Sequence, residues 1–486
     1  MPGYAAKMMF ARSRREFAGM QGWLGGPQAA GLDHAVLEEE LAARGRELQR
    51  LLLQDHLDAR AAAEQRCAQV TGPDAVARTR AERGHARSLA TVFGPVVVSR
   101  IAYRAAGAPN VHPADAQLNL PPGRHSHGLA RMAVSAVVGG SFGQACAQVT
   151  ARTGSKLGKR QCQQLIRAAA ADFAGFYAAR RPPGGPPGEV LALSCDGKGI
   201  VVLPGQLRYR AALAARKAVP RQDGRLSRGE VRNRKRMAEI GAVFGLAPVP
   251  RTAGQILDPG PRPKAPRAAR KWITASVAAD AAAVVASVFA EADRRDPAHQ
   301  RTWIALADGN THQITRIAAE AAARGITLTI ICDFIHVLEY LWTAAWCFFP
   351  EASPDAGPWV RARAAAVLDG HATTVAAAIR AQAAARALTT AQRKTATRTA
   401  GYLDAKAPYL DYPRALAAGW PISSGVIEGT CRYLVNDRMD ITGARWTVAT
   451  AEAVLQLRAL HANGDLDTYW TYHLQQEHRR TYRLAA

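Results

Sequence analysis

The chain has 486 residues, a formal net charge of +24 and a pI of about 10.3. This length allows two or three domains with a buried core, and the basic balance favours a polyanionic partner, with nucleic acid as the first candidate. An organism-wide preference for Arg and Ala would produce the same balance, so composition leaves both explanations open.

The cysteines and the N-terminus exclude further classes of protein. Seven Cys are scattered with no Cys-x-x-Cys pair, which disfavours a zinc ribbon or a disulfide framework and fits a reducing compartment. The first residues lack the apolar segment of a signal peptide, and no apolar run is long enough to cross a membrane. We therefore expect a cytoplasmic protein without membrane contact.

The first 122 residues combine a helical arm with a hairpin. Residues 1–30 show no hydrophobic period and are expected to be poorly ordered. Residues 32–69 carry Leu at mostly helical spacing, which predicts an amphipathic helix that either packs on its own domain or forms a coiled-coil-like dimer contact. Residues 90–104 alternate and are rich in Val and Ile, which predicts a β-hairpin, and residues 106–122 are typical of a loop.

Residues 123–180 are predicted to form a helix-turn-helix-like DNA-binding domain. Helical periods over 126–138, 142–153 and 159–180 are separated by glycine-containing turns. The third segment is basic near its start, so Lys159 and Arg160 are candidate DNA contacts, although a plain three-helix bundle has the same pattern. The Pro- and Gly-rich residues 181–188 are then predicted to be a linker.

In residues 191–202 an apolar run ends at Asp196 and resumes after Gly-Lys-Gly, which predicts two short strands joined by a tight turn. A further strand is expected over 238–248. Residues 204–236 and 250–271 are expected to be solvated loops whose cations either contact DNA phosphates or are merely hydrated. The candidate DNA contacts in the first of these loops are Arg208, Arg210, Arg216, Lys217, Arg232, Arg234, Lys235 and Arg236.

The rest of the chain alternates strands and helices, which predicts an α/β domain with a mixed sheet flanked by helices. A strand over 302–307 ends at Asp308, a helix follows over 310–324, and a strand over 326–332 runs into Asp333. The α/β domain is expected to cover 189–349 and 419–465, interrupted by an Ala-rich, all-helical insertion over 350–418. A helix is expected over 448–462 and a C-terminal tail over 466–486.

Three carboxylates stand out in the α/β domain. Asp196 and Asp308 each end a short apolar strand, and Glu428 lies near the start of a helix that Ser424 and Gly425 open. Taken singly, an Asp can brace a turn and a Glu can complement the helix dipole. Together they supply the hard oxygen ligands of two-metal phosphoryl transfer, with Asp196 bridging two Mg²⁺ or Mn²⁺ ions and Asp308 and Glu428 each holding one.

Other side chains are candidates for supporting roles. Asp333 and His336 are too few for a zinc site and are expected to orient the carboxylates or a phosphate, unless His336 is a satisfied core residue. Arg432 lies one helical turn after Glu428, where it steadies that carboxylate, contacts phosphate or only forms an i, i+4 pair. The base-stacking candidates Trp342 and Trp346 either pack in the core or stack on an unpaired base.

With these residues in place, the chain resembles bacterial insertion-sequence transposases of the DDE class, in the Mutator-related branch and closest to its Kra-type group. The resemblance covers most of the chain. Its carriers are Cys195-Asp196-Gly197, Ala307-Asp308-Gly309, Asp333-x-x-His336, Ser424-Gly425-x-x-Glu428, Arg438, Gly443, Trp446 and Leu457-Arg458-Ala459. It implies a ribonuclease H-like catalytic fold after a mainly helical N-terminal DNA-binding region, Mg²⁺-dependent cleavage and joining at element ends, and an oligomeric synaptic complex.

One departure from the family concerns the stretch after Tyr103, where relatives often carry the paired Cys of a small zinc ribbon. Here the stretch reads AAGAPNVHPADAQ and holds no Cys. We therefore expect no zinc, and a different way of binding the element ends.

The function expected from the sequence is DNA transposition in the bacterial nucleoid. The protein would bind the terminal inverted repeats of its own element, cut DNA with two Mg²⁺ or Mn²⁺ ions per site and join 3′-hydroxyl ends to target DNA. Its partners would be double-stranded DNA and further copies of itself, as a dimer or a larger assembly. Two alternatives stay open: a structure-specific endonuclease on the same fold, and an inert, transposase-derived DNA-binding protein.

Overall fold

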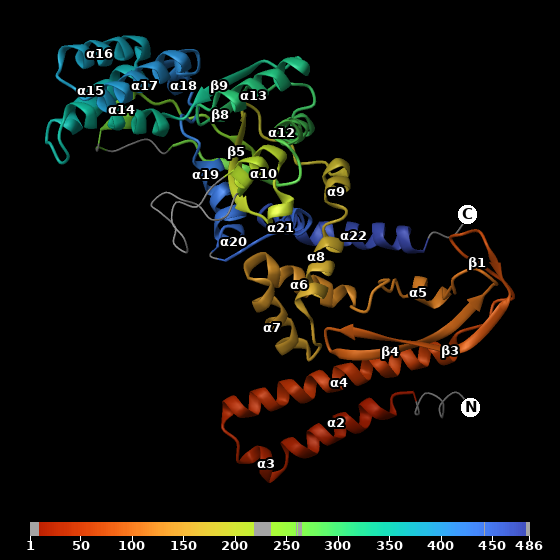
Figure 1. Ribbon diagram of the computed structural model, residues 1–486. Coiled ribbons are helices and arrows are strands. Elements are labelled where there is room, and N and C mark those ends of the chain that lie inside the picture. Colours follow the sequence, from red (N-terminus) through yellow and green to blue (C-terminus); the bar gives the residue numbers. More distant parts are fainter. Residues whose placement is uncertain (1–8, 218–234, 259, 261–264, 442, 483–486) are drawn as a thin grey trace. The chain divides into compact units, whose positions relative to one another are not determined.

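The computed structural model describes residues 9–217, 235–258, 260, 265–441 and 443–482 (Figure 1). The chain divides into two compact units, the first built from residues 1–178 and 464–486 and the second from residues 179–463. The C-terminal segment therefore belongs to the same unit as the N-terminal residues. Among the described helices, none combines the length and the apolar character that a membrane span requires.

The first unit combines helices with a long β-ribbon. In chain order its elements are α2 (Ala11–Leu24), α3 (Pro27–Ala30), α4 (His34–Ala63), β1 (Val70–Thr71), β2 (Ala77–Arg78), β3 (Arg80–Thr91), β4 (Gly94–Arg104), α5 (Pro113–Gln117), α6 (His127–Gly139), α7 (Phe142–Thr153), α8 (Lys159–Ala169), α9 (Phe173–Ala179) and α22 (Leu466–Thr481). Residues 466–486, expected to be a tail, thus contain a helix.

The expectation of a poorly ordered N-terminus was wrong for residues 11–30. Helix α2 lies along the long helix α4, as Figure 1 shows. Asp55 of α4 accepts a hydrogen bond from the Arg12 guanidinium at 2.8 Å and one from the backbone N–H of Ser13 at 3.0 Å. This tertiary contact orders a segment whose own hydrophobic period is too weak to predict a helix.

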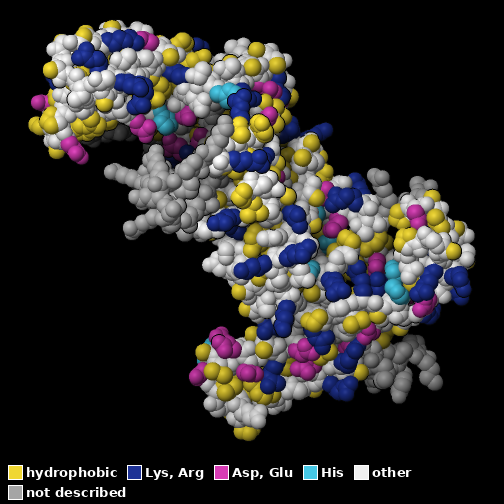
Figure 2. Space-filling view, in the orientation of Figure 1, with side chains coloured by type: hydrophobic (Ala, Val, Ile, Leu, Met, Phe, Trp, Pro, Cys, Tyr) yellow, Lys and Arg dark blue, Asp and Glu magenta, His cyan; other side chains and the backbone are white. Residues whose placement is uncertain are grey.

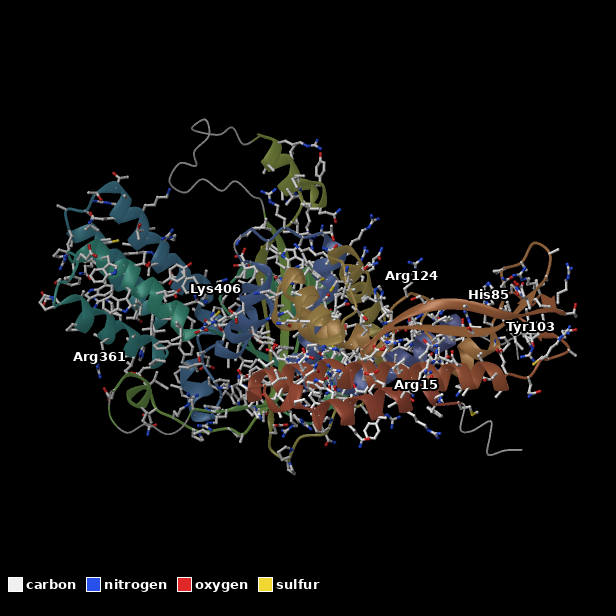
Figure 3. All side chains as sticks on the ribbon, turned by 90° about the horizontal axis from the view of Figure 1, so that it is seen from below. Arg15, His85, Tyr103, Arg124, Arg361 and Lys406 are labelled. Atoms are coloured by element: carbon white, nitrogen blue, oxygen red, sulfur yellow. The ribbon has the colours of Figure 1, made fainter. Side chains whose placement is uncertain are left out.

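Strands β3 and β4 form the predicted hairpin, but β3 begins at Arg80 rather than near Ala90. Helix α4 packs on β4, and Gln54 exchanges two hydrogen bonds of 2.8 Å with the backbone of Val97 at the outer edge of the strand. His85 and Tyr103 lie on this ribbon (Figure 3). At Val97 the edge strand therefore does not offer its backbone to other chains.

The helices predicted over 126–180 are present, with α6, α7 and α8 packed against one another. Helix α7 matches its predicted range, since Ser141 and Gln144 form a capping box at its start and Gly154 ends it at φ +69°. The third predicted helix is divided into α8 and α9. The helical predictions here hold because local capping signals mark the ends.

The second unit is an α/β domain. Its elements are β5 (Val190–Val201), η1 (Pro204–Gln206), α10 (Tyr209–Lys217), β6 (Lys235–Leu246), α11 (Ala253–Leu257), β7 (Ala268–Ser276), α12 (Ala281–Arg295), β8 (Trp303–Ala307), α13 (Thr311–Ala323), β9 (Leu328–Cys332), α14 (Phe334–Phe348), α15 (Ala356–Leu368), α16 (Ala372–Ala385), α17 (Thr390–Lys406), η2 (Ala407–Tyr409), α18 (Tyr412–Ala417), α19 (Gly425–Cys431), η3 (Arg432–Asn436), α20 (Asp437–Met439) and α21 (Val448–Ala462).

Within the described residues, the sheet of this unit has five strands in the order β7-β6-β5-β8-β9. Strands β7, β6 and β5 are antiparallel, and β5, β8 and β9 are parallel. Helix α12 packs on β5, β6 and β7, and α13 packs on β8 and β9. The mixed sheet flanked by helices is the architecture that the alternating sequence pattern predicts.

The predicted hairpin at 191–202 was wrong, because β5 is one continuous strand that pairs with β6 along its whole length. Gly197 and Gly199 stay extended opposite Glu239 and Met237. A Cβ on Gly199 would lie 2.9 Å from the Cβ of Lys235 on β6, so this glycine allows a close approach of strands rather than a turn. Asp196 therefore lies inside a strand.

Helices α14 to α17 form an all-helical segment that is not separate from the sheet. Its buried residues, among them Trp359, Ala376 and Leu403, belong to the same hydrophobic cluster as Ile304 and Leu306 of β8. The small Ala side chains let the helices approach closely. One core therefore supports both the sheet and the helical segment, so a change in one is transmitted to the other.

Candidate functional site

Three aspartates lie level with one another at the carboxyl edge of the parallel strands. Ser194 of β5 pairs with Leu306 of β8, so two residues further along Asp196 is level with Asp308. The pairing of β8 with β9, continued in the same way, puts Asp333 level with Asp308. The carboxyl edge of parallel strands is a common place for binding sites in α/β sheets.

The carboxylate of Asp196 is half-buried and has three donors around it. Its Oδ1 accepts a hydrogen bond from the backbone N–H of Gly197 at 2.7 Å. Its Oδ2 accepts from the Cys431 thiol at 3.1 Å and lies 3.4 Å from the Lys198 ammonium. Burial raises the pKa of Cys431, and the charge of Asp196 raises it further, so the thiol keeps its proton and remains a donor.

Lys198 interacts electrostatically with both Asp196 and Glu428. Burial lowers the pKa of Lys198, but the charge of Asp196, its hydrogen bond to Lys198 and the charge of Glu428 hold the pKa above its ordinary value. The ammonium is therefore positively charged near both Asp196 and Glu428. A cation in this place offsets the repulsion between the two carboxylates.

Glu428 is exposed on α19, a short helix that packs on β5 and β6. One turn earlier, the backbone N–H and the hydroxyl of Ser424 both donate hydrogen bonds to Oδ2 of Asp333, the first at 2.7 Å. Oδ1 of Asp333 accepts from the backbone N–H of Ile335 at 2.7 Å and caps α14. The fully buried Asp333 therefore joins the starts of α14 and α19 and sets the place of Glu428.

The structure brings Glu428 together with Asp333 and His336. One ligand atom from each of these side chains lies within 4.8 Å of the others, a spacing that suits a metal ion. Asp196 and Asp308 are not part of this group, although Asp308 and Asp333 share neighbours such as Cys332. Oδ1 of Asp308 accepts a hydrogen bond from the backbone N–H of Asn310 at 2.8 Å.

Helix α17 of the helical segment reaches the loop that follows Asp308. A Cβ on Gly309, which has φ +90°, would lie 2.6 Å from the Tyr402 hydroxyl, so this position needs glycine for both its conformation and its space. One turn later the buried Lys406 donates a hydrogen bond of 2.7 Å to the hydroxyl of Thr311 (Figure 3). Sequence reasoning missed both contacts, because they join segments far apart in the chain.

Glu239 is a further acidic residue that sequence reasoning missed. It lies opposite Gly197 in the pairing of β5 with β6, next to Asp196. Burial raises the pKa of Glu239, and the charge of Asp196 raises it too, against the lowering effect of Arg208 and Arg316. The sequence did contain a signal for Glu239, because a charged residue inside the apolar run 238–248 is unusual for a buried strand.

Arg432 lies one helical turn after Glu428, and its backbone N–H donates a hydrogen bond to the Glu428 carbonyl. Helix α19 ends at Cys431, and residues 432–436 form a π-helical turn that rotates the following side chains. In the described part of the chain, the ion-pair partner of Arg432 is Asp437, at 3.7 Å. The Arg432 side chain remains 81% exposed and is free to approach an anion.

The candidate DNA contacts in residues 204–236 differ in their surroundings. Arg210 and Arg216 are exposed on α10, which also includes Lys217. Arg208, Lys235 and Arg236 have partners within the unit, at 2.8 Å to the Ala279 carbonyl, 2.6 Å to Asp440 and 2.8 Å to the Val277 carbonyl. Arg232 and Arg234 lie outside the described residues.

In the first unit, Lys159 and Arg160 are exposed at the start of α8. Figure 2 shows Lys and Arg side chains scattered over the face in view rather than gathered in one patch. On this face the basic side chains are therefore dispersed, and they do not mark out one patch for a polyanion.

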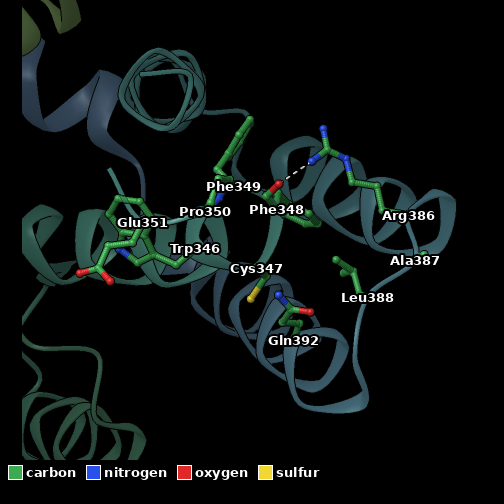
Figure 4. Close-up of a pocket in the computed structure, with 10 residues that line it drawn as sticks. All are labelled: Trp346, Cys347, Phe348, Phe349, Pro350, Glu351, Arg386, Ala387, Leu388 and Gln392. Atoms are coloured by element: carbon green, nitrogen blue, oxygen red, sulfur yellow. Dashed lines mark hydrogen bonds between the residues drawn. The ribbon is translucent and has the colours of Figure 1, made fainter. Parts of the chain in front are cut away.

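The candidate stacking residues Trp342 and Trp346 are not core residues. They are 37% and 44% exposed and stack on each other, with ring centroids 5.3 Å apart. Trp346 also borders a cavity of about 860 Å³ in the helical segment (Figure 4). In this cavity the Arg386 guanidinium donates a hydrogen bond of 2.6 Å to the Phe348 carbonyl.

Neither a scan against protein-family models nor a search of the curated proteins finds a match for this chain.

Proposed function

We propose that this chain is a DNA transposase of the DDE class with a ribonuclease H-like catalytic domain in its second unit. The observation that carries the proposal is the register of the sheet, which sets Asp196 level with Asp308 on neighbouring parallel strands. A sheet of three antiparallel strands extended by two parallel ones is the arrangement expected of that fold. Glu428 comes from a helix packed against β5.

The residues present fit a divalent metal. Asp196, Asp308 and Glu428 are carboxylates, none of them is fully buried, and Glu428 and Asp333 lie at metal-ligand spacing with His336. Bound cations at such a site would activate an attacking oxygen and stabilise the leaving one. Asp196 and Asp308 would hold cations at the sheet edge, and Glu428 would hold one from the helix side.

Side chains around the carboxylates supply the remaining needs of phosphoryl transfer. Lys198 keeps the charge of Asp196 balanced, and the exposed Arg432 offers a cation to a phosphate. Arg210 and Arg216 would contact the DNA backbone from α10. The stacked, exposed pair Trp342 and Trp346 would receive an unpaired base, since aromatic faces stack on bases of any sequence.

The test is a mobility assay in cells. The gene with its native flanks is placed on a donor plasmid, and new junctions are sequenced for the wild type, Asp196→Ala and Asp308→Asn. The exposed Asp369, which follows α15 in the helical segment, supplies the control Asp369→Asn. We expect junctions with a short target duplication from the wild type and the control, and at least about a hundredfold fewer from the two site variants.

Other outcomes would contradict the proposal. Junctions equally frequent in Asp196→Ala would reject the catalytic assignment. Cleaved element ends that are never joined to a target would favour a structure-specific endonuclease. DNA binding by the purified chain with neither cleavage nor joining would favour an inert, transposase-derived binding protein.

A further inference from the structure

The group formed by Asp333, His336 and Glu428 has the composition of a mixed nitrogen and oxygen metal site. Asp333 immediately precedes α14, His336 lies in the first turn of α14, and Glu428 comes from α19, almost a hundred residues later. Their ligand atoms lie within 4.8 Å of one another. Ligand atoms on opposite sides of one ion are about 4.0–4.4 Å apart, since each lies about 2.0–2.2 Å from it, so a group within 4.8 Å has the size to surround one ion.

The histidine has a carboxylate beside one of its two ring nitrogens. Its Nδ1 lies 3.0 Å from Oε2 of Glu339, one turn further along α14. An ionised carboxylate only accepts, so Nδ1 carries the proton and Nε2 is left as the nitrogen that can bind a metal. A carboxylate behind the imidazole is the usual support of metal-binding histidines, because it fixes the tautomer and the ring and raises the basicity of the ligating nitrogen.

The buried carboxylate is held in one orientation but is not saturated. Asp333 accepts three hydrogen bonds, from the backbone N–H of Ile335 and from the backbone N–H and hydroxyl of Ser424. An ionised carboxylate has about four acceptor positions, so about one is left for a metal. Solvent and metal ions can reach the site at His336, whose side chain is 32% exposed, and at the exposed Glu428.

We infer that Asp333, His336 and Glu428 form a site for a first-row transition-metal dication, such as Mn²⁺, in preference to Mg²⁺. Mg²⁺ selects oxygen ligands in an octahedral arrangement, whereas imidazole nitrogen suits transition metals. The inference deepens the proposed function and rests on it only for the catalytic role of the ion. It assigns His336 as a ligand rather than as a neighbour of the ligands.

The test uses Mn²⁺ with the full chain and does not depend on activity. Pulsed electron paramagnetic resonance of the Mn²⁺ complex should show coupling to one ¹⁴N nucleus, which persists in about a hundredfold excess of Mg²⁺. The variant His336→Asn should lose this coupling and bind Mn²⁺ at least about tenfold more weakly in a calorimetric titration. His371→Asn, at an exposed histidine before α16, is the matched control and should keep both signals.

A further variant and a set of contrary outcomes complete the test. Glu339→Gln removes only the support behind the imidazole, so the coupling should remain while the Mn²⁺ affinity falls about tenfold. Mn²⁺ bound without ¹⁴N coupling, or with equal affinity in His336→Asn, would overturn the inference. Coupling in a protein that never joins DNA ends would uphold the metal site and reject the transposase, whereas Asp196-dependent joining without coupling would do the reverse.

Discussion

At the scale of single residues, Asp333 is the side chain on which the geometry of the candidate site depends most. It is fully buried, and its carboxylate ties the start of α14 to Ser424, the residue that precedes the helix of Glu428. A buried carboxylate is tolerated only when hydrogen bonds compensate for its lost hydration. Its role as a tie between two helices follows from contacts across almost a hundred residues.

Ser424 allows this tie to be weakened without removing the charge. Ser424→Ala deletes the hydroxyl that donates to Asp333, and we expect it to lower the free energy of unfolding by about 1–3 kcal/mol, since hydrogen bonds to charged groups contribute about this much. The measurement is urea unfolding followed by Trp fluorescence, because most Trp residues lie in the second unit.

The neighbouring Ser423 is the control for this prediction. It is exposed, and Ser423→Ala should change the free energy of unfolding by less than about 0.5 kcal/mol. If both alanine variants unfold at the same urea concentration, the bond between Ser424 and Asp333 contributes nothing to stability.

At the scale of elements, the pairing of β5 with β6 corrects the prediction of a turn after Asp196. Gly-Lys-Gly is a common turn signal, but here the glycines remove side chains where the two strands approach closely. A local signal cannot distinguish these uses of glycine. The partner strand, about forty residues later, decides between them.

Glycines in the second unit give a prediction at this scale. A Cβ on Gly241 of β6 would overlap the Val288 side chain of α12, which is fully buried and has no space into which to move. We expect Gly241→Ala to lower the free energy of unfolding of this unit by about 1–3 kcal/mol, as overpacking does. Urea unfolding under the conditions used for Ser424 measures it.

Gly401 of α17 provides the opposite case. A Cβ there would meet open space, and Ala is the better helix former, so Gly401→Ala should raise stability by up to about 1 kcal/mol. A destabilised Gly401→Ala, or an unaffected Gly241→Ala, would contradict the packing described for α12 and α17.

At the scale of the whole molecule, the first of the two units contains a histidine whose lowered pKa makes the stability of that unit depend on pH. In the first unit, His112 and His85 stack, and Nε2 of His112 lies 2.7 Å from Nδ1 of His85. Burial lowers the pKa of His112 to about 4, helped by the charges of Arg100 and Arg87 and opposed by Asp115. His112 is therefore neutral in the folded unit at pH values where the unfolded chain is protonated.

This lowered pKa predicts acid lability of the first unit. Between pH of about 6.5 and 4 the unfolded chain binds more protons than the folded one, so stability is lost as the pH falls through this window. We expect a loss on the order of 2 kcal/mol, after allowing for partial exposure to solvent. Hydrogen exchange of the β3 and β4 amides at several pH values measures it.

His112→Gln should remove most of this pH dependence, because glutamine does not titrate. His56→Gln, at an exposed histidine of α4 in the same unit, should leave the dependence as in the wild type. An equal pH dependence in the wild type and His112→Gln would show that another group controls the acid stability of this unit.

Much of the local structure could be predicted from the sequence. Helices with strong caps were found close to their true ends, as α7 and α21 show, and the strands ending at Asp308 and Asp333 were found as well. Capping residues, glycine stops and apolar runs act over a few residues, so their effect can be read without the fold. The mixed α/β class follows from the order of these elements.

The candidate site itself depends on tertiary structure. Asp196 and Asp308 could be singled out because each follows an apolar run, but only the register of β5, β8 and β9 sets them level and adds Asp333. Contacts between distant segments also group Glu428 with His336 and place α17 against the loop after Asp308. A contact of the same kind, with α4, holds α2 in a helix. Local sequence carries no information on which distant segments meet, because packing of the shared core decides it.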